Sequence, residues 1–321
     1  MNLHENRNLF ISIVKDMSEK TSISEVYIEK DYWLTRALQR LSKNPSVEKV
    51  VFKGGTALSK IGITCRFSED IDIAVIEANS FSGNQLKMLI KRLAKDMADE
   101  LEEKVVKGIT SKGSRFYKAI YLYPNLVGQE TKTAVKTGQL LIEINTFANP
   151  YPYSKQQITS FLSDYLLSLN RQDLVEKYNL LPFSVNVLDK RRTMLEKLVS
   201  LFRFSFSENP KIELAKKIRH FYDLYYLAND KDCAEYIQSI DFQKELQELF
   251  TQDQQEFDKP QGWQTKAVKD SPLVTDFPLL WNTLRDTYLS ELPKLAFISV
   301  PDEKEIEKKF MEIMQKINSS K

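Results

Sequence analysis

The sequence of 321 residues is poor in the residues that build disulfide frameworks and nitrogen- or sulfur-ligated metal centres. It contains only two cysteines, Cys65 and Cys233, and two histidines, His4 and His220. These cysteines cannot form a disulfide framework or a zinc site by themselves, and such low thiol usage fits a reducing compartment. The scarcity of histidine excludes a histidine-rich metal centre. We therefore expect a cytoplasmic protein in which any metal ion is held by oxygen ligands.

The chain also lacks a long apolar run. No stretch approaches the roughly 20 apolar residues that a membrane-spanning helix requires. The N-terminal stretch MNLHENRNLFISIVKDM lacks the basic segment and apolar core of a signal peptide. With 42% hydrophobic and 28% charged residues, the composition is that of a globular protein that buries a substantial core. These features predict no membrane partner.

Charge of one sign is not in excess overall, because the net charge is only +2, but the charges are unevenly distributed. Residues 104–138 include seven Lys/Arg and one acid, and residues 189–220 include nine Lys/Arg and four acids. Residues 232–258 reverse this balance, with eight acids and one lysine. Two basic blocks are typical of a protein that faces a polyanion. The solvated faces of helices and loops would give the same pattern.

The hydrophobic periodicity predicts a mixed front half and a helical back half. The front half is expected to contain helices over 6–20, 24–41 and 84–106, strands over 49–52, 71–76, 115–123, 139–147 and 183–187, and short helices between 152 and 177. The back half is expected to contain helices over 189–204, 211–228, 232–250 and 303–317, with an irregular segment over 251–271. We therefore expect an α+β fold with two domains, 1–187 and 188–321.

Residues 50–76, VVFKGGTALSKIGITCRFSEDIDIAVI, form the most informative stretch. A short apolar strand leads into Gly54-Gly55, where the lack of a Cβ lets the backbone turn sharply and approach a ligand closely. Backbone N–H groups that follow such a turn can face phosphate oxygens. Hydroxyls and cations that could assist belong to Lys53, Thr56, Ser59 and Lys60. The spacing of a Walker P-loop is absent, so this is not that motif.

Two aspartates, Asp70 and Asp72, close the stretch. Alternate residues of a strand face the same side, so the two carboxylates share one space and repel each other unless a cation lies between them. Magnesium, which proteins bind through one or two carboxylates plus substrate phosphates, is the natural cation. Apolar residues at 71 and 73 indicate that the other face of the strand is buried, which argues against a simple exposed strand end.

Glu143 is the best candidate for a third carboxylate, because it interrupts the otherwise apolar strand LLIEINTF. Three acids would complete a site for two magnesium ions. One ion would bridge a triphosphate to Asp70 and Asp72, and the other would activate an attacking hydroxyl with Glu143 as ligand or base. The alternative is that Glu143 pairs with a basic neighbour on the sheet.

Gly-Gly-Thr, thirteen residues and then Asp-x-Asp closely resembles the first motif of the DNA polymerase beta-type nucleotidyltransferase superfamily. The longer string KGGTALSK…RFSEDIDI resembles one branch, the AbiEii toxin family of bacterial abortive-infection and toxin–antitoxin systems, which includes MenT-type toxins. The preceding EKDYWLTRAL and the later RTMLEKLVSLFR and KIRHFYDLYYLA are similar to further motifs of that branch. The resemblance extends over about residues 29–228.

This resemblance implies a polymerase-beta-like sheet flanked by helices, followed by a helical domain that contributes to the active-site cleft. Asp70 and Asp72 match the metal-binding acids, Lys197 a lysine that contacts the nucleotide, and Asp223 a distal active-site aspartate. Glu143 rests mainly on the superfamily pattern. The residues implied to bind the nucleotide are Lys53, Gly54, Gly55, Thr56, Ser59, Lys60, Arg66 and Ser68. Ser68 also aligns with a serine that becomes self-phosphorylated in some relatives.

Elementary alternatives exist for the helical positions. Lys197 lies among apolar residues, where a lysine can also extend its ammonium group to the surface. Asp223 lies four residues after Arg219, and such pairs are often weak surface contacts. His220 suits a packed helix position better than a functional one.

Together these observations predict a magnesium-dependent nucleotidyltransferase that moves a nucleoside monophosphate from an NTP to a hydroxyl and releases pyrophosphate. The resemblance implies a toxin that acts on RNA, with the 3′ end of tRNA as acceptor, an antitoxin as partner and phage defence as setting. The loop 124–138, with Lys132 and Lys136, and the block 189–220 could follow a phosphate backbone. The alternatives are a small-molecule or protein acceptor, and a non-catalytic nucleotide-binding regulatory module.

Overall fold

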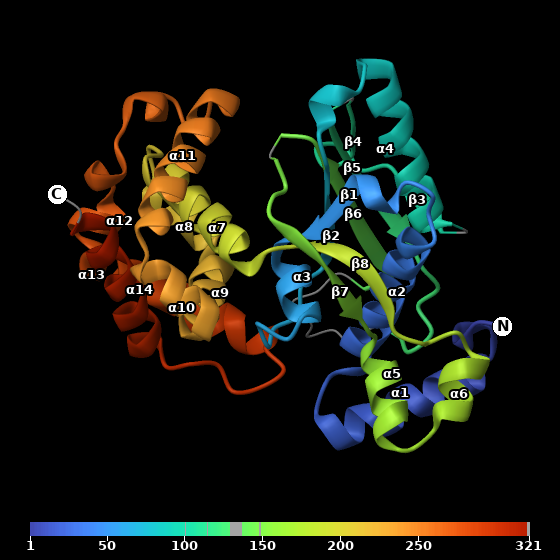
Figure 1. Ribbon diagram of the computed structural model, residues 1–321. Coiled ribbons are helices and arrows are strands. Elements are labelled where there is room, and N and C mark those ends of the chain that lie inside the picture. The colour runs from blue at the N-terminus through green and yellow to red at the C-terminus, as the bar shows by residue number, and fades with distance from the viewer. Residues whose placement is uncertain (100, 114, 129–136, 148, 320–321) are drawn as a thin grey trace. The chain divides into compact units, whose positions relative to one another are not determined.

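The computed structural model describes residues 1–99, 101–113, 115–128, 137–147 and 149–319. Their contacts define two compact units, Met1–Gly62 with Phe67–Leu188, and Ile63–Arg66 with Asp189–Lys321. The elements of each unit are labelled in Figure 1. Residues 63–66, expected in the first domain, belong to the second unit because Arg66 pairs with Asp223 there and forms a β-bridge with Ala296.

The described strands of the first unit form one mixed sheet in the order β3-β5-β6-β2-β1-β8-β7, with β4 paired to β5. These strands are β1 (Val50–Lys53), β2 (Asp70–Val75), β3 (Glu102–Lys104), β4 (Ser111–Lys112), β5 (Phe116–Leu122), β6 (Gln139–Asn145), β7 (Tyr153–Ile158) and β8 (Phe183–Leu188). The central strand β2 runs antiparallel to β1 and parallel to β6. The two strands that carry the predicted acids are therefore neighbours in the sheet.

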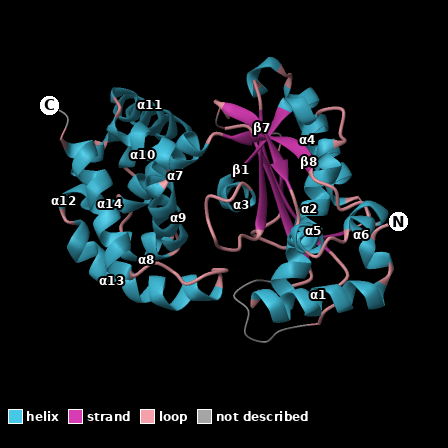
Figure 2. Ribbon diagram, turned by 60° about the horizontal axis from the view of Figure 1, so that its bottom comes forward, coloured by secondary structure: helices cyan, strands magenta, loops and turns pink. Residues whose placement is uncertain are grey.

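Helices of the first unit cover this sheet unequally. They are α1 (Arg7–Thr21), α2 (Glu25–Ser42), α3 (Gly54–Lys60), α4 (Gly83–Ala98), α5 (Phe161–Ser168) and α6 (Gln172–Lys177). Helix α2 contacts β6 and β8, α4 contacts β5 and β6, and α3 contacts β1 and β2. Figure 2 shows α2 and α4 along one face of the sheet and α3 beside the other.

The alternation of side chains in β2 and β6 explains this arrangement. The isoleucines of both strands are fully buried in the core that also contains residues of α2 and α4; they are Ile71, Ile73, Ile142 and Ile144. Each such burial stabilises the fold by roughly 1.5–3 kcal/mol. A slip of one residue would turn these side chains outward and bury the acids, so the register is strongly determined. The acids Asp70, Asp72 and Glu143 consequently occupy the opposite face.

The structure corrects two elements expected in the front half. Helix α4 ends at Ala98 instead of 106, since Asp99 takes a positive φ of 52° and Glu102–Lys104 pairs with β5. The segment after Pro152 begins with strand β7 instead of a helix. The four central residues of β7 are exposed, so it is held by backbone pairing with β8 and has no hydrophobic periodicity to reveal it.

The second unit is helical where it is described. Its helices are α7 (Lys190–Ser205), α8 (Pro210–Ala215), α9 (Ile218–Asn229), α10 (Lys231–Gln238), α11 (Ile240–Glu256), α12 (Pro272–Thr275), α13 (Phe277–Glu291) and α14 (Glu303–Asn318). Helix α7 packs against both α9 and α11. The single helices expected over 211–228 and 232–250 are each two helices. The helices α10 and α11 are separated at Ser239, because its hydroxyl accepts a hydrogen bond from the Phe242 N–H and caps α11.

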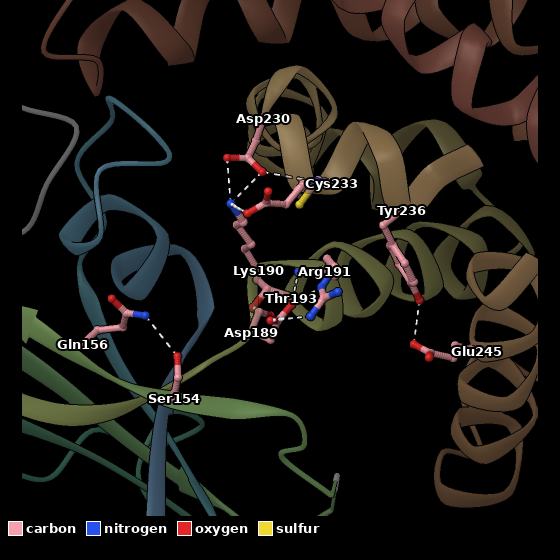
Figure 3. Close-up of polar contacts among 11 residues, drawn as sticks. Ser154, Gln156, Asp189, Lys190, Arg191, Thr193, Asp230, Cys233, Tyr236 and Glu245 are labelled. Atoms are coloured by element: carbon pink, nitrogen blue, oxygen red, sulfur yellow. Dashed lines mark hydrogen bonds and ion pairs between the residues drawn. The ribbon is translucent and has the colours of Figure 1, made fainter. Parts of the chain in front are cut away.

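Charged side chains hold the beginning of α7 in place. Asp189 caps the helix by accepting a hydrogen bond from the Arg191 N–H at 2.8 Å. Lys190 pairs with Asp230, the N-cap of α10, at 2.7 Å (Figure 3). Part of the basic block 189–220 therefore serves helix capping and helix–helix contact. Among the described helices, none is long and apolar enough to cross a membrane.

Candidate active site

One cross-strand row on the sheet carries four charged residues. Lys53 lies opposite Asp72, Asp72 opposite Glu143, and Glu143 opposite Lys118, on the neighbouring strands β1, β2, β6 and β5. Directly opposed residues have Cβ atoms about 4.5–5.5 Å apart, so their side chains interact. The row is anionic at its centre and cationic at both ends.

Asp70 and Asp72 lie on the same face of β2 and share an unfavourable environment for negative charge. Burial, followed by the charges of Glu143 and Asp70, raises the pKa of Asp72 to about 7. Burial and the neighbouring Glu69 also raise the pKa of Asp70. Two carboxylates that resist ionisation in this way are stabilised by a bound cation.

The glycine turn is built around Asp72. Gly54 has a φ of +81°, and a Cβ at this position would overlap Asp72 Oδ2 and lie 3.1 Å from Asp72 Cγ. The Thr56 hydroxyl donates a hydrogen bond to the Asp70 carbonyl oxygen at 2.5 Å. The turn and the aspartate strand are thus fastened to each other. We expected the missing Cβ of Gly54 to let the backbone approach a ligand, and the structure shows that it leaves room for the Asp72 carboxylate.

Glu143 pairs with a basic neighbour on the sheet, which is the alternative to metal binding that the sequence left open. Lys118 Nζ donates a hydrogen bond to Glu143 Oε2 at 3.0 Å. Among the residues that the structure describes, no group of three or more His, Cys, Asp or Glu side chains is arranged to hold a metal ion. Asp70 and Asp72 together offer two carboxylates, and Mg²⁺ is commonly bound by one or two carboxylates and completed by water and substrate phosphates.

Lys60 does not lie free beside the glycine turn. Its ammonium group contacts Asp31 Oδ1 at 2.6 Å, Thr35 Oγ1 at 2.7 Å and the Thr159 carbonyl oxygen at 2.7 Å. The side chain is only 6% exposed. An ammonium group has three donors, and all of them are used here. The expectation that Lys60 binds phosphate is corrected to a buried ion pair that attaches α3 to α2.

Helix α2 carries a run of three buried charges that its apolar periodicity does not predict. Glu29, Lys30 and Asp31 are each at most 3% exposed. Their partners are, in order, the Leu126 N–H, the Glu69 carboxylate and the Lys60 ammonium group. Three consecutive charges flanked by apolar residues were the available signal, because buried charges require partners. Lys30 also lowers the pKa of Asp70, so it helps to hold the aspartate pair.

The remaining residues predicted around the turn lie in the first unit. Lys53 ends β1, Gly55 and Ser59 lie on α3, and Ser68 lies in the segment that leads into β2. All four are partly exposed. They therefore lie on elements that are next to the aspartate strand in the sequence or in the sheet. Their role in nucleotide binding stays a prediction.

The other predicted residues form a separate cluster within the second unit. Arg66 donates from Nε and Nη2 to the two carboxylate oxygens of Asp223, each at 2.7 Å, and Lys197 contacts Asp223 Oδ2 at 2.7 Å. All three side chains are at most 7% exposed. Burial alone would raise the pKa of Asp223, but Arg66 and Lys197 together hold it well below its usual range.

This cluster rules out two simpler explanations for Lys197 and Asp223, namely a lysine that reaches the surface and a weak surface pair along one helix. Lys197 is buried in an ion pair and does not extend its ammonium group to the surface. Asp223 pairs with Arg66 and Lys197, which an i,i+4 reading of its helix did not predict. His220 lies near the cluster, where burial and the charge of Lys197 lower its pKa well below the usual value. Its imidazole is therefore neutral at physiological pH, and the cluster carries a net charge of about +1.

A mixed sheet that carries paired aspartates against a glycine turn is the arrangement of a nucleotidyltransferase. The sequence comparison narrows this class, because residues 36–316 match the family model described as "Nucleotidyl transferase AbiEii toxin, Type IV TA system". The chain belongs to this family of nucleotidyltransferase toxins. A search of curated proteins found no match.

One solved structure, that of MenT4, shows the same fold. MenT4, a nucleotidyltransferase toxin from Mycobacterium tuberculosis H37Rv, matches with a TM-score of 0.57 and 15% identity, over 97% of this chain and 90% of that chain. JHP933 from Helicobacter pylori matches with a TM-score of 0.47 and 16% identity, over 92% and 93% of the two chains. The likeness to MenT4 confirms the expected α+β fold over nearly the whole chain.

Proposed function

We propose that this enzyme transfers a nucleoside monophosphate from an NTP to a hydroxyl of RNA, with the 3′ end of tRNA as acceptor, and that it requires Mg²⁺ held by Asp70 and Asp72. The observation that carries the proposal is the aspartate pair itself. Two partly buried carboxylates on one face of β2, with raised pKa values and a glycine turn built against them, are costly to the fold unless a cation uses them.

The reaction requires an acceptor oxygen to attack the α-phosphorus while the bond from that phosphorus to the bridging oxygen breaks and pyrophosphate leaves. When bound, Mg²⁺ supplies the positive charge that neutralises the triphosphate and favours ionisation of the acceptor hydroxyl. Asp70 and Asp72 hold and orient the cation. Glu143 accepts the proton of the acceptor hydroxyl. The turn residues Lys53, Gly54, Gly55, Thr56, Ser59 and Ser68 bind the triphosphate.

Lys197 is proposed as a nucleotide contact, as the family resemblance implies, and the Asp223 carboxylate holds its ammonium group. The support is electrostatic, because two cations around one carboxylate leave a positive charge suited to phosphate. Asp223 fixes the direction of both cations, so its role is positioning. The resemblance implies a nucleotide contact for Lys197 and Arg66 and an active-site role for Asp223; in the structure Arg66 pairs through two nitrogens with Asp223.

RNA as acceptor has its main support in the family resemblance, because the charge of the described residues supports it less than the composition suggested. Within the block 189–220, five of the nine cations pair with carboxylates of the same unit: Lys190, Arg191, Lys197, Arg203 and Lys216. That block is therefore a weaker candidate for RNA than its composition suggested. The other candidate, Lys132 and Lys136 in the loop 124–138, lies outside the described residues. A cytoplasmic setting with an antitoxin partner and a role in phage defence completes the proposal.

A transfer assay tests the acceptor. The full-length protein is incubated with each labelled NTP, Mg²⁺ and total tRNA, and in parallel with protein and small-molecule fractions. Label in tRNA that depends on Mg²⁺ and disappears in Asp72→Asn supports the proposal. Label in a protein or small-molecule fraction would assign a different acceptor. NTP binding without transfer to any fraction would contradict the proposal in favour of a regulatory module.

A further inference from the structure

Lys118 occupies a special place in the row of charges. It lies on β5 directly opposite Glu143, and its ammonium group is 3.0 Å from Glu143 Oε2. The lysine side chain is 29% exposed and the glutamate side chain 22% exposed, so the pair lies at the partly buried floor of the polar face. Glu143 therefore already has a resident counter-ion.

The charge of Lys118 acts on the whole acid group. Burial lowers the pKa of Lys118, but the charges of Glu143, Asp70 and Asp72 outweigh it and raise the pKa above its usual value. A lysine ammonium group is charged at physiological pH by its ordinary pKa, and the 3.0 Å contact with Glu143 places that charge in the acid group. In return, Lys118 lowers the pKa of both aspartates. Each of the three acids consequently interacts with this one lysine.

We infer that Lys118 takes the place of a second metal ion, so that the active site binds a single divalent cation at Asp70 and Asp72. This inference rests on the proposed function. A second divalent ion at Glu143 would have to displace the ammonium group or lie next to it, and like charges at such distances repel strongly in a partly buried site. The Glu143–Lys118 pair is neutral by itself, which leaves two aspartate charges for one divalent cation. Lys118 is then a positioning residue for Glu143.

The inference predicts a stoichiometry that can be counted without any turnover. Mn²⁺ is titrated into the full-length protein in the presence of a non-hydrolysable α,β-methylene NTP, and bound ions are counted by electron paramagnetic resonance. We expect one Mn²⁺ per chain in the wild type and none at this site in Asp72→Asn. Two Mn²⁺ per wild-type chain, with the spin coupling of neighbouring ions, would overturn the inference.

Removal of the lysine charge is the complementary experiment. Lys118→Met should admit a second Mn²⁺ or tighten Mn²⁺ binding at least fivefold, while Lys118→Arg should keep one ion. Lys112→Met is the matched control, because Lys112 forms a similar pair with Glu103 at 2.7 Å outside the row and should leave binding unchanged. Unchanged stoichiometry and affinity in a folded Lys118→Met, verified by circular dichroism, would contradict the role of Lys118.

The wild-type count decides the question even if Lys118→Met fails to fold. Failure of this inference is distinguishable from failure of the proposed function. Two bound ions with intact transfer to tRNA would overturn the single-ion site alone. Absence of any Mn²⁺ at Asp70 and Asp72 would overturn both.

Discussion

Gly54 and Asp72 occupy mutually exclusive space, since a Cβ on the glycine would overlap the Oδ2 atom of the aspartate. Gly54→Ala would also place a side chain at a φ of +81°, a conformation that costs non-glycine residues about 1–3 kcal/mol. We expect this variant to displace the carboxylate and to reduce nucleotidyl transfer about 100-fold, because small misplacements of catalytic groups have effects of that size.

Gly62→Ala separates the effect of backbone strain from the effect of a collision with Asp72. Gly62 has a similar φ of +75°, and a Cβ there would meet nothing within 4 Å. The Gly62→Ala variant should therefore lose about as much stability as Gly54→Ala but keep its transfer activity. Thermal unfolding and the labelled-NTP assay, run side by side, measure both quantities. Equal losses of activity in the two variants would show that backbone strain, and not the collision with Asp72, is responsible.

Asp72 should make the metal-free protein less stable as the pH rises. Its pKa is about 7 in the folded protein and 3.8 in the reference state. Between these values the unfolded chain releases a proton that the folded protein retains, so stability falls from about pH 4 to about pH 7 and then stays level. Asp72→Asn removes this loss and should stabilise the protein by up to about 4 kcal/mol at pH 8, with little effect at pH 4.

Urea denaturation in EDTA at several pH values measures this difference. Asp286→Asn is the control, because the Asp286 side chain is 90% exposed and its substitution should leave the pH profile unchanged. A difference between Asp72→Asn and wild type that is constant with pH, or a variant less stable at pH 8, would contradict the prediction.

Asp223 should contribute strongly to the stability of the second unit. Asp223→Asn leaves Arg66 and Lys197 buried together without their carboxylate, and the loss of one partner of a buried ion pair costs about 3–5 kcal/mol. Lys197→Met should cost less, because the bidentate pair of Arg66 and Asp223 remains. As a surface control, Asp232→Asn removes a partner of Lys190 that is 67% exposed and should cost at most about 1 kcal/mol.

Chemical denaturation should show the largest loss of stability for Asp223→Asn, a smaller loss for Lys197→Met and the smallest for Asp232→Asn. Repeated at several pH values, it also measures how the contribution of Asp223 to stability depends on pH. The lowered pKa of Asp223 means that its contribution is fully present above about pH 4 and is lost as the pH falls towards the folded-state pKa. A folded Lys197→Met with greatly reduced transfer would separate its proposed nucleotide contact from its part in stability. If Lys197→Met destabilised the chain more than Asp223→Asn, the charge argument for the cluster would be wrong.

The parts of the fold and site that follow from the sequence are those encoded by local periodicity. Strand β2 and the shared face of Asp70 and Asp72 follow from alternation of apolar and polar residues. Lys118 as the partner of Glu143 could not be identified, because it depends on the pairing of β5 with β6 across 25 residues. Strand β7 was missed since its side chains are mostly exposed and carry no periodic signal.

Ion pairs between residues far apart in the sequence cannot be predicted from local periodicity either. Arg66 and Asp223 are separated by 157 residues and meet only because residues 63–66 join the second unit. Spacing along one helix relates Asp223 only to its helix neighbour Arg219 and contains no information on Arg66. Consecutive charges flanked on both sides by apolar residues are a usable sign of such buried partners, as Glu29, Lys30 and Asp31 show.

Lys53 and Lys60, both expected to bind phosphate, should behave differently when each is replaced by methionine. Lys60→Met leaves Asp31 buried without its cation, so we expect a loss of about 3–5 kcal/mol in stability. The KM for NTP should be unchanged in the protein that folds, because Lys60 has no donor left for phosphate. Lys53→Met removes a partly exposed charge at the end of the acid row, so stability should change by at most about 1 kcal/mol.

The KM for NTP should rise in Lys53→Met, since its charge is proposed to act on the triphosphate. Urea denaturation and initial rates over a range of NTP concentrations measure both properties for each variant. Lys60→Arg serves as the control that keeps the charge. A raised KM in a fully stable Lys60→Met would return Lys60 to the nucleotide site, and an unchanged KM in Lys53→Met would remove Lys53 from it.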